Sequence, residues 1–211
     1  MSKPRCCLRL AVPIAMSIGL ILAAAASPAL AQGAAAPPVL NLDKGPLGPP
    51  APSPLKPGDA FGETVTLPER TIVFMKGHTN WDAAFDTLTD AFKSLNEYLD
   101  KQGIKPNGPF ITIYTQTDDT GFSFQAAAPV ASAPANPPKG DIAVGTAPGG
   151  KALKFVHRGS YDAMDSTYEA ITNYLDDKQL EAKDLFIEEY TTDPVKTDPN
   201  SLVINVFVPI K

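Results

Sequence analysis

The amino-acid sequence predicts an α+β domain built from two related halves, in which two helices cover one antiparallel-rich sheet. Two observations carry this prediction: the sequence repeats itself at a spacing of about 80 residues, and each copy has the same order of strand, helix, strand and strand. The size of the domain agrees with this prediction, since residues 59–211 amount to one ordinary domain of about 150 residues, with a single core.

The repeat appears when the domain is aligned with itself. At an offset of 80, Trp81 falls on Tyr161, and at an offset of 76, Tyr114 falls on Tyr190. The change of four residues lies inside the helices and is close to one turn of 3.6 residues. We therefore expect the first helix to be one turn longer, with its apolar face in the same phase.

Apolar spacing defines the elements of each half. The expected strands and helices are residues 71–76, 81–101, 110–116 and 122–127, then 152–157, 161–178, 185–190 and 202–208. Residues at three- and four-residue spacing mark the helix faces: Phe85, Leu88, Phe92, Leu95 and Leu99 in one helix, and Tyr161, Met164, Tyr168, Ile171 and Leu175 in the other. Helices on one face leave the other face of the sheet half-open in such a two-layer domain.

Three local features complete this prediction. Ser160 is expected to cap the second helix through its side-chain oxygen. Residues 126–138, rich in Ala and Pro, are expected to form a mobile surface loop. Residues 145–150 contain three glycines but no Lys-Ser/Thr pair, so we interpret them as a turn and not as a phosphate-binding loop.

The first 31 residues predict export. Lys3, Arg5 and Arg9 precede and flank an uncharged apolar run from Leu10 to Ala26, and residues 29–31 read Ala-Leu-Ala. The alternative is a membrane-spanning helix, but the run is short and a small-residue cleavage site follows it. We expect a signal peptide over residues 1–31 and a bacterial protein that is periplasmic or secreted, with no membrane span after cleavage.

Residues 32–58 predict a linker. They contain eight prolines among Ala, Gly and Ser, and no amphipathic period. Such a segment has little apolar surface to bury, so we expect a disordered tether that precedes a folded domain at residues 59–211.

Composition narrows the classes of function. Cys6 and Cys7 lie in the leader, so the mature chain would have no disulfide and no cysteine metal site. Removing the three positive charges of residues 1–31 changes the net charge from −5 to −8, which makes nucleic acid an unfavourable partner. His78 and His157 show no metal-ligand spacing. We expect neither a metal nor a cofactor.

Several segments together resemble a known family. The runs LKFVHRGSYDAM, FIEEYTTDP and VINVFVPI are similar to the GyrI-like family, the effector-binding domain of AraC- and MerR-type regulators. The resemblance implies two βαββ halves about a pseudo-two-fold axis. It also implies a groove between the halves for small organic molecules, often aromatic cations. No helix-turn-helix region precedes the domain here, so the expected form is a stand-alone exported binder.

The resemblance also implies a site. A glutamate forms the floor of the groove in such domains, and the matching position is Glu188, whose partner by the repeat is Thr112. Glu189 must point to the opposite face of its strand, so one of the two carboxylates is expected to be solvated. Phe110 and Phe186 are assigned to the core. The expected ligand-binding residues are Glu188, Tyr190, Tyr161, Trp81, Tyr114 and Thr112, whose rings can stack on a flat ligand or face a cation.

The leading functional hypothesis is an exported domain that captures a small hydrophobic, cationic aromatic molecule between its halves, without catalysis. One alternative is a hydrolase of strained, electrophilic small molecules that uses Glu188 as general base. Another alternative, suggested by SOUL-type proteins of the same fold, is a binder of haem or another tetrapyrrole.

Overall fold

The structure is a computed structural model that describes residues 55–136 and 138–211. The predicted signal peptide, residues 1–31, and residues 32–54 of the predicted tether lie outside the described residues. None of the helices found in the described ranges combines the length and the hydropathy needed to cross a membrane.

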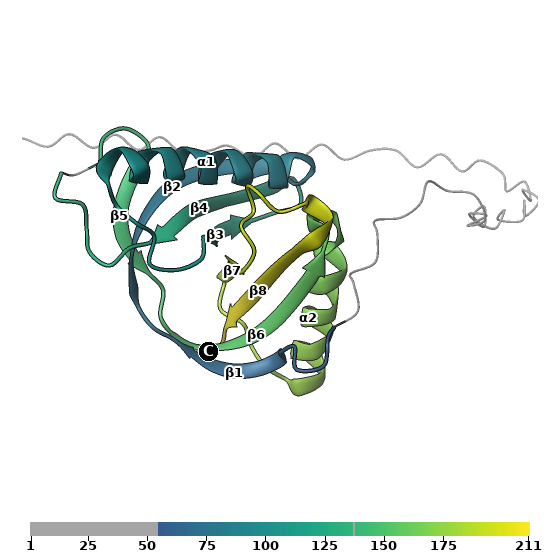
Figure 1. Ribbon diagram of the computed structural model, residues 1–211. Helices are drawn as coiled ribbons and strands as arrows, with labels where there is room; N and C mark the ends of the chain where they lie inside the picture. Colours follow the sequence, from purple (N-terminus) through teal and green to yellow (C-terminus); the bar gives the residue numbers. More distant parts are fainter. Residues whose placement is uncertain (1–54, 137) are drawn as a thin grey trace, which may run out of the picture. The chain divides into compact units, whose positions relative to one another are not determined.

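The described chain forms two helices and one sheet, which confirms the predicted α+β class (Figure 1). The elements are β1 (Phe61–Leu67), β2 (Arg70–Asn80), η1 (Trp81–Ala83), α1 (Ala84–Gln102), β3 (Ile111–Thr117), β4 (Gly121–Pro129), β5 (Ile142–Ala147), β6 (Gly150–Gly159), η2 (Tyr161–Ala163), α2 (Met164–Lys178), β7 (Phe186–Tyr190), η3 (Pro199–Ser201) and β8 (Leu202–Pro209). The sheet order is β1-β6-β8-β7-β3-β4-β2-β5, with every neighbouring pair antiparallel.

The two halves of the domain are related as the repeat predicts. Helix α1 has 19 residues and α2 has 15, so the first is one turn longer. In the middle of the sheet β3 pairs with β7, and Thr112 lies directly opposite Glu188. These two repeat partners therefore flank the pseudo-two-fold axis.

The first strand of each half was not predicted. Strand β1 pairs with β6 of the second half, and β5 pairs with β2 of the first half, so each half lends a strand to the edge of the other. Both are edge strands. Strand β1 is interrupted by a bulge at Gly62, and β5 is a short run of the residues IAVGTA, so neither shows a clean apolar alternation. The expected turn at residues 145–150 is correct only after Ala147, where β5 ends.

The expected loop at residues 126–138 is wrong at its start. Ala126, Ala127 and Ala128 are fully buried and continue β4 as far as Pro129. Small side chains in a strand allow close packing above and below the sheet, although alanine by itself does not favour strands. The connection to β5 therefore begins only at Val130.

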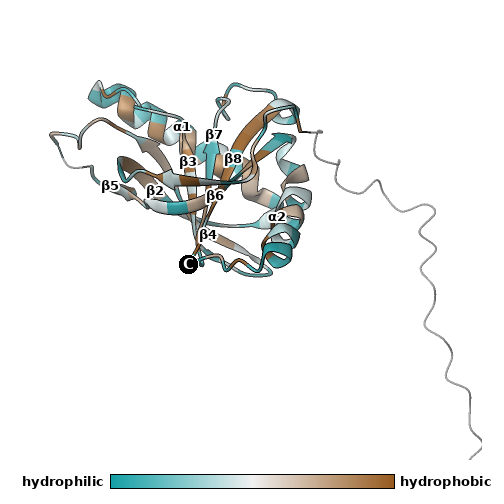
Figure 2. Cartoon of the chain, turned by 90° about the horizontal axis from the view of Figure 1, so that it is seen from below, coloured by the Kyte–Doolittle hydropathy of each residue, from teal (hydrophilic) through white to brown (hydrophobic). Residues whose placement is uncertain are grey.

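The sheet has a core on each face, so the expected single core and half-open face are wrong. The cluster under the helices includes Leu88, Leu95 and Ile171. The opposite cluster includes Ile111 and Ile187, with side chains of β1 and β5 packed against it. Figure 1 shows that the sheet is curved, and Val65 and Leu67 of β1 and Ala143 of β5 pack against the second cluster. In Figure 2 the hydrophilic residues gather on the outer sides of α1 and α2.

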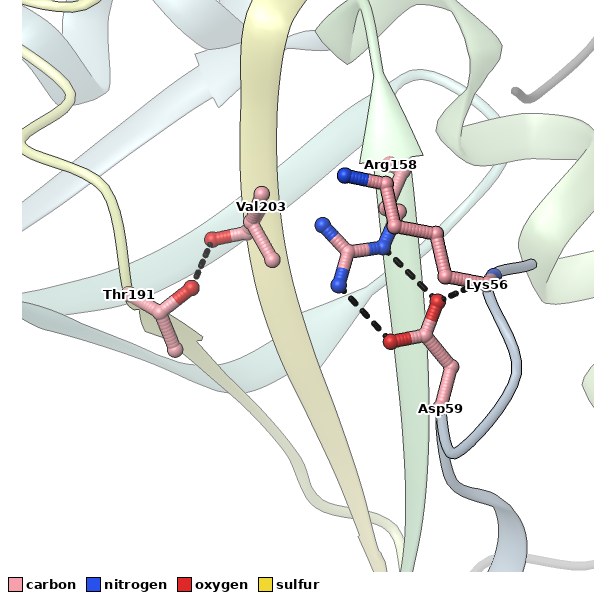
Figure 3. A network of polar contacts seen from close by, with 5 residues as sticks. All are labelled: Lys56, Asp59, Arg158, Thr191 and Val203. Atoms are coloured by element: carbon pink, nitrogen blue, oxygen red, sulfur yellow. Dashed lines mark hydrogen bonds and ion pairs between the residues drawn. The ribbon is translucent and has the colours of Figure 1, made fainter. Parts of the chain in front are cut away.

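A bidentate ion pair fixes the start of the domain (Figure 3). Arg158 donates from Nε to Asp59 Oδ2 and from Nη2 to Asp59 Oδ1, both over 2.7 Å, and the backbone amide of Lys56 donates to the same carboxylate over 2.6 Å. These bonds hold the pKa of Asp59 at about 2, below its ordinary value of 3.8. The entry to β1 is thereby attached to the end of β6.

The two helices begin differently from the prediction. Asn80 caps the first turn, because its Oδ1 accepts from the amide of Ala83 over 2.9 Å. Ser160 makes no such bond. Instead its carbonyl accepts from Nε2 of His157 over 3.0 Å, and Nδ1 of that ring accepts from the Thr167 hydroxyl over 2.7 Å. A neutral imidazole fits these bonds, and burial lowers the pKa of His157.

Leu95→Ala should reduce the free energy of unfolding by about 2 to 5 kcal/mol, because Leu95 is fully buried between α1 and the sheet. Denaturant titration measures this loss. Lys93→Ala, on the exposed side of the same helix, serves as the control and should stay within about 0.5 kcal/mol of wild type. An equally small effect for Leu95→Ala would show that α1 buries a different face.

Asp59→Asn should lower the melting temperature in a pH-dependent way. A depressed pKa stabilises the fold above the ordinary pKa of 3.8, and this stabilisation is lost as pH falls through the folded pKa of about 2. The gap between the melting temperatures of wild type and variant should therefore be full at neutral pH and close toward pH 2. A gap that stays constant over this range would contradict the assigned ion pair.

Candidate functional site

Two adjoining cavities, of about 650 and 310 Å³, lie between the N-terminal ends of the two helices. Both are lined by Trp81, Tyr114, Asp165 and Tyr168. The larger one adds Thr117, Asp118, Asp119 and Phe186, and the smaller one adds Asp82, Ala84, Tyr161, Asp162 and Met164. Both halves thus contribute to one hollow of the size of a small-molecule site.

Local structure directs Tyr114 into this hollow. Strand β3 shifts its register against β4 after Tyr114, which leaves Thr115 as a bulge whose hydroxyl donates to Ser123 O over 3.2 Å. The second half repeats the motif, since Thr191 donates to Val203 O over 2.7 Å (Figure 3). A bulge twists a strand and re-aims the neighbouring side chain.

Trp81 forms a fixed wall at the mouth of the cavities. Its indole Nε1 donates to the carbonyl of Asp118 over 2.9 Å, and its ring packs on Phe122 with 4.8 Å between centroids. These contacts hold the ring in place even though it is largely exposed. An aromatic surface fixed before binding loses little entropy when a ligand stacks on it.

A buried carboxylate lies beneath the cavities. Glu188 is fully buried, and its two oxygens accept from the hydroxyls of Tyr168 over 2.9 Å and Tyr190 over 2.8 Å. The hydroxyls of Tyr114 and Tyr161 are 2.8 Å apart and also lie close to this carboxylate. We call these four tyrosines and Glu188 the tyrosine–glutamate cluster.

Burial dominates the electrostatics of this cluster. It raises the pKa of Glu188, although hydrogen bonds from the tyrosines, Tyr190 first, act in the opposite direction by stabilising the ionised form. Burial also raises the pKa of all four tyrosines well above 10, with the charge of Glu188 as the next cause. The tyrosines therefore remain hydrogen-bond donors, and no Lys, Arg or His among the described residues pairs with the Glu188 side chain.

Thr112, which faces Glu188 across the axis, is also fully buried. Its hydroxyl makes no hydrogen bond to any part of the chain that the structure describes. The duplication thus places one carboxylate, and not two, at the centre of the sheet.

The rim of the cavities is acidic. Its five aspartates are Asp82, Asp118, Asp119, Asp162 and Asp165, whereas none of the described residues lining the cavities is Lys or Arg. Asp118 accepts from the hydroxyl and amide of Thr120 and from the amide of Gly121, and these bonds lower its pKa. The rim therefore provides a negative potential that attracts cations.

The six residues expected from the sequence fall into two layers. Trp81, Tyr114 and Tyr161 line the cavities. Glu188, Tyr190 and Thr112 lie below them, each buried. All six belong to one region, but Glu188 is covered by tyrosines and does not itself form the exposed floor.

Sequence reasoning missed six of the eight residues that line the larger cavity, including two aromatic residues, Tyr168 and Phe186. Tyr168 was read as part of the apolar helix face, and Phe186 was assigned to the core. A signal was present for Tyr168, because it is a hydroxyl-bearing residue on an otherwise apolar face. The rim aspartates gave no signal in the sequence.

The expectation that one of the two neighbouring carboxylates is solvated is wrong. Glu189 lies on the opposite face of β7, where Oε1 is 3.4 Å from Nη2 of Arg70 and Oε2 accepts from Asn205 over 3.2 Å. Only 15% of its side chain is exposed. Glu189 is therefore largely buried and paired with Arg70, whereas Glu188 is fully buried and has no cation beside it among the described residues.

Comparison with known proteins gives a family and a fold. The family model described as the GyrI-like small molecule binding domain matches residues 63–211. No curated protein matches the chain in sequence. Solved structures share the fold, and three of them have identities to this chain between 14% and 17%.

The first of these is the EcmrR–DNA complex, with a TM-score of 0.61, 15% identity and coverage of 72% of this chain but only 57% of that chain. The C-terminal domain of EcmrR matches with a TM-score of 0.57, 14% identity and coverage of 72% and 98%. SAV2435 bound to tetraphenylphosphonium matches with a TM-score of 0.51, 17% identity and coverage of 72% and 94%.

Tyr168→Phe should raise the pKa of Glu188 further, because it removes a hydrogen bond that stabilises the ionised carboxylate. The side-chain carboxyl carbon signal, followed by NMR over pH, reports this shift. Tyr174→Phe is the matched control: it lies on the same helix, but its hydroxyl donates to Gly62 O over 3.3 Å. An unchanged or lowered pKa in Tyr168→Phe would contradict the assigned bond.

Proposed function

Because this chain belongs to the GyrI-like small-molecule-binding family, we propose that it captures a small, hydrophobic, aromatic cation in the cavities between its two halves. The observation that carries the proposal is the tyrosine–glutamate cluster, in which a fully buried carboxylate has no positive partner within residues 55–136 and 138–211 and lies beneath an aromatic cavity. A cation in the cavity supplies the missing charge, and the rings of Trp81, Tyr114 and Phe186 provide surface for it.

Two further features support this choice. The rim carries five aspartates and no basic residue among the described lining residues, which favours cations over anions. SAV2435, which shares the fold, has been solved with tetraphenylphosphonium, an organic cation.

The geometry favours binding over hydrolysis. A general base must reach a water molecule through a free oxygen. Both oxygens of Glu188 already accept from tyrosines, and Glu188 does not line either cavity. Haem capture is also disfavoured, since neither His78 nor His157, the residues best suited as axial ligands, lines the cavities.

We also propose that the protein acts in the periplasm or outside the cell, on the evidence of the leader-like sequence at residues 1–31. Fractionation of cells that produce the full chain tests this. The mature protein should be found outside the cytoplasm, and should remain inside when residues 1–31 are deleted. Equal retention of both forms in the cytoplasm would overturn the proposal.

Glu188→Gln should weaken binding of N-methylquinolinium by roughly 1.5 to 3 kcal/mol, the range for hydrogen bonds and contacts that involve a charged group. The substitution keeps the shape of the side chain and removes its charge. Binding of the neutral isostere 1-methylnaphthalene should hardly change. Titration calorimetry of both ligands against wild type and variant measures the difference.

The matched control is Glu169→Gln, the same substitution at an exposed position of α2 outside the cavities. It should leave both affinities unchanged. Equal losses of cation and isostere in Glu188→Gln would show that the charge of Glu188 does not select the ligand. Failure of wild type to bind any aryl cation would refute the proposed function itself.

A further inference from the structure

The pseudo-two-fold symmetry of the domain should generate two equivalent cavities, one on each side of the axis. In the described residues, cavities lie around Trp81 and Asp165. The two helices start 80 residues apart, so Trp81 corresponds to Tyr161 and Asp165 to Phe85. We call the place of Tyr161 and Phe85 the image position of the open cavity. The side chain that fills the image position therefore indicates which chemical group fits the open cavity.

In the image position an aromatic ring occupies the space. Phe85 stacks on Tyr161 across the axis, with 5.1 Å between ring centroids and 28° between ring planes. Behind it, Phe92 packs on Phe110 at 4.9 Å and on Tyr190 at 5.2 Å. This half of the groove is therefore closed by side chains of the protein itself.

The connection that follows the central strand of each half, β3 or β7, also differs between the open and the closed half. In the open half β3 and β4 are joined by residues 118–120 alone, and Asp118 and Asp119 line the larger cavity. In the closed half the connection between β7 and β8 is longer, and Val195 packs against the helix-side core. The asymmetry is thus built from both a side chain and a loop.

At the open position the ring is absent. Asp165 replaces the phenyl group of Phe85 with a short carboxylate, and the cavities take up the space between it and Trp81. One side of the indole packs on Phe122, and 45% of Trp81 remains exposed. A fixed aromatic surface next to a carboxylate, in the place where symmetry puts a phenyl ring, is complementary to an aryl group that carries a positive charge.

We propose that an aryl ring of the ligand stacks on Trp81, in the place that Phe85 takes against Tyr161, with its positive charge directed toward Asp165. The proposal rests on the proposed function and makes it specific, since it selects ligands with a flat aryl ring joined directly to the cationic centre. Trp81 and Asp165 determine this specificity, while the tyrosine–glutamate cluster lies beneath the same cavity.

The decisive variant is Asp165→Phe, which restores to the open half the ring that closes the other half. We expect it to weaken N-methylquinolinium by more than about tenfold, because the new ring occupies the site. Glu169→Phe, the same change on the exposed side of α2, is the matched control and should bind like wild type. Asp165→Asn should weaken the cation by roughly two- to fivefold, as for an exposed ion pair, and spare 1-methylnaphthalene.

A second measurement uses wild type and does not depend on how Asp165→Phe folds. Trp81 is the sole tryptophan of the chain, so its indole protons can be assigned without ambiguity. We expect nuclear Overhauser contacts between these protons and the aryl protons of bound N-methylquinolinium. Circular dichroism and melting of Asp165→Phe show whether its affinity can be compared.

The outcomes separate this inference from the proposed function. If wild type binds no aryl cation, the proposed function fails. If wild type binds, but a folded Asp165→Phe binds within about twofold of it, the ligand does not take the Trp81 position. Absence of indole contacts in the wild-type complex overturns the inference in the same way, and leaves the proposed function standing.

Discussion

The structure depends on one buried carboxyl group at its centre, that of Glu188. Glu188 has no exposure to solvent, so its carboxylate is stable only because Tyr168 and Tyr190 donate to both oxygens. The donors come from α2 and β7, and the neighbouring hydroxyls of Tyr114 and Tyr161 come from opposite halves. The cluster therefore requires both halves to meet in one register across β3 and β7.

The duplication explains both the symmetry and the single site. The two halves repeat the bulge after the central strand, the short turn before each helix and the aromatic residue at that turn. The two halves differ at the positions that form the candidate site. Thr112 faces Glu188 so that one carboxylate is buried, and Asp165 replaces Phe85 so that one half of the groove stays open.

The sequence could predict what the repeat and the helical period encode. These include both helices and their difference in length, whereas the central place of Glu188 was implied by the resemblance to the GyrI-like family. The edge strands β1 and β5 were not predicted, because each pairs on one side only and its apolar and polar residues alternate weakly. Strand alternation predicts the face of the sheet on which Glu188 lies, but not that Glu188 is buried. Its burial depends on Tyr168 of α2, and how a helix packs on a sheet cannot be read from the sequence of the strand.

The most direct test of the central claim is the number of protons released when a cation binds. Burial raises the pKa of Glu188, and a cation in the cavity favours the ionised form, so binding should lower that pKa and release a proton. Calorimetric titration of N-methylquinolinium in buffers of different ionisation enthalpy counts these protons. We predict release by wild type and none by Glu188→Gln. Equal release by both proteins, or none by wild type at any pH near that pKa, would contradict the account.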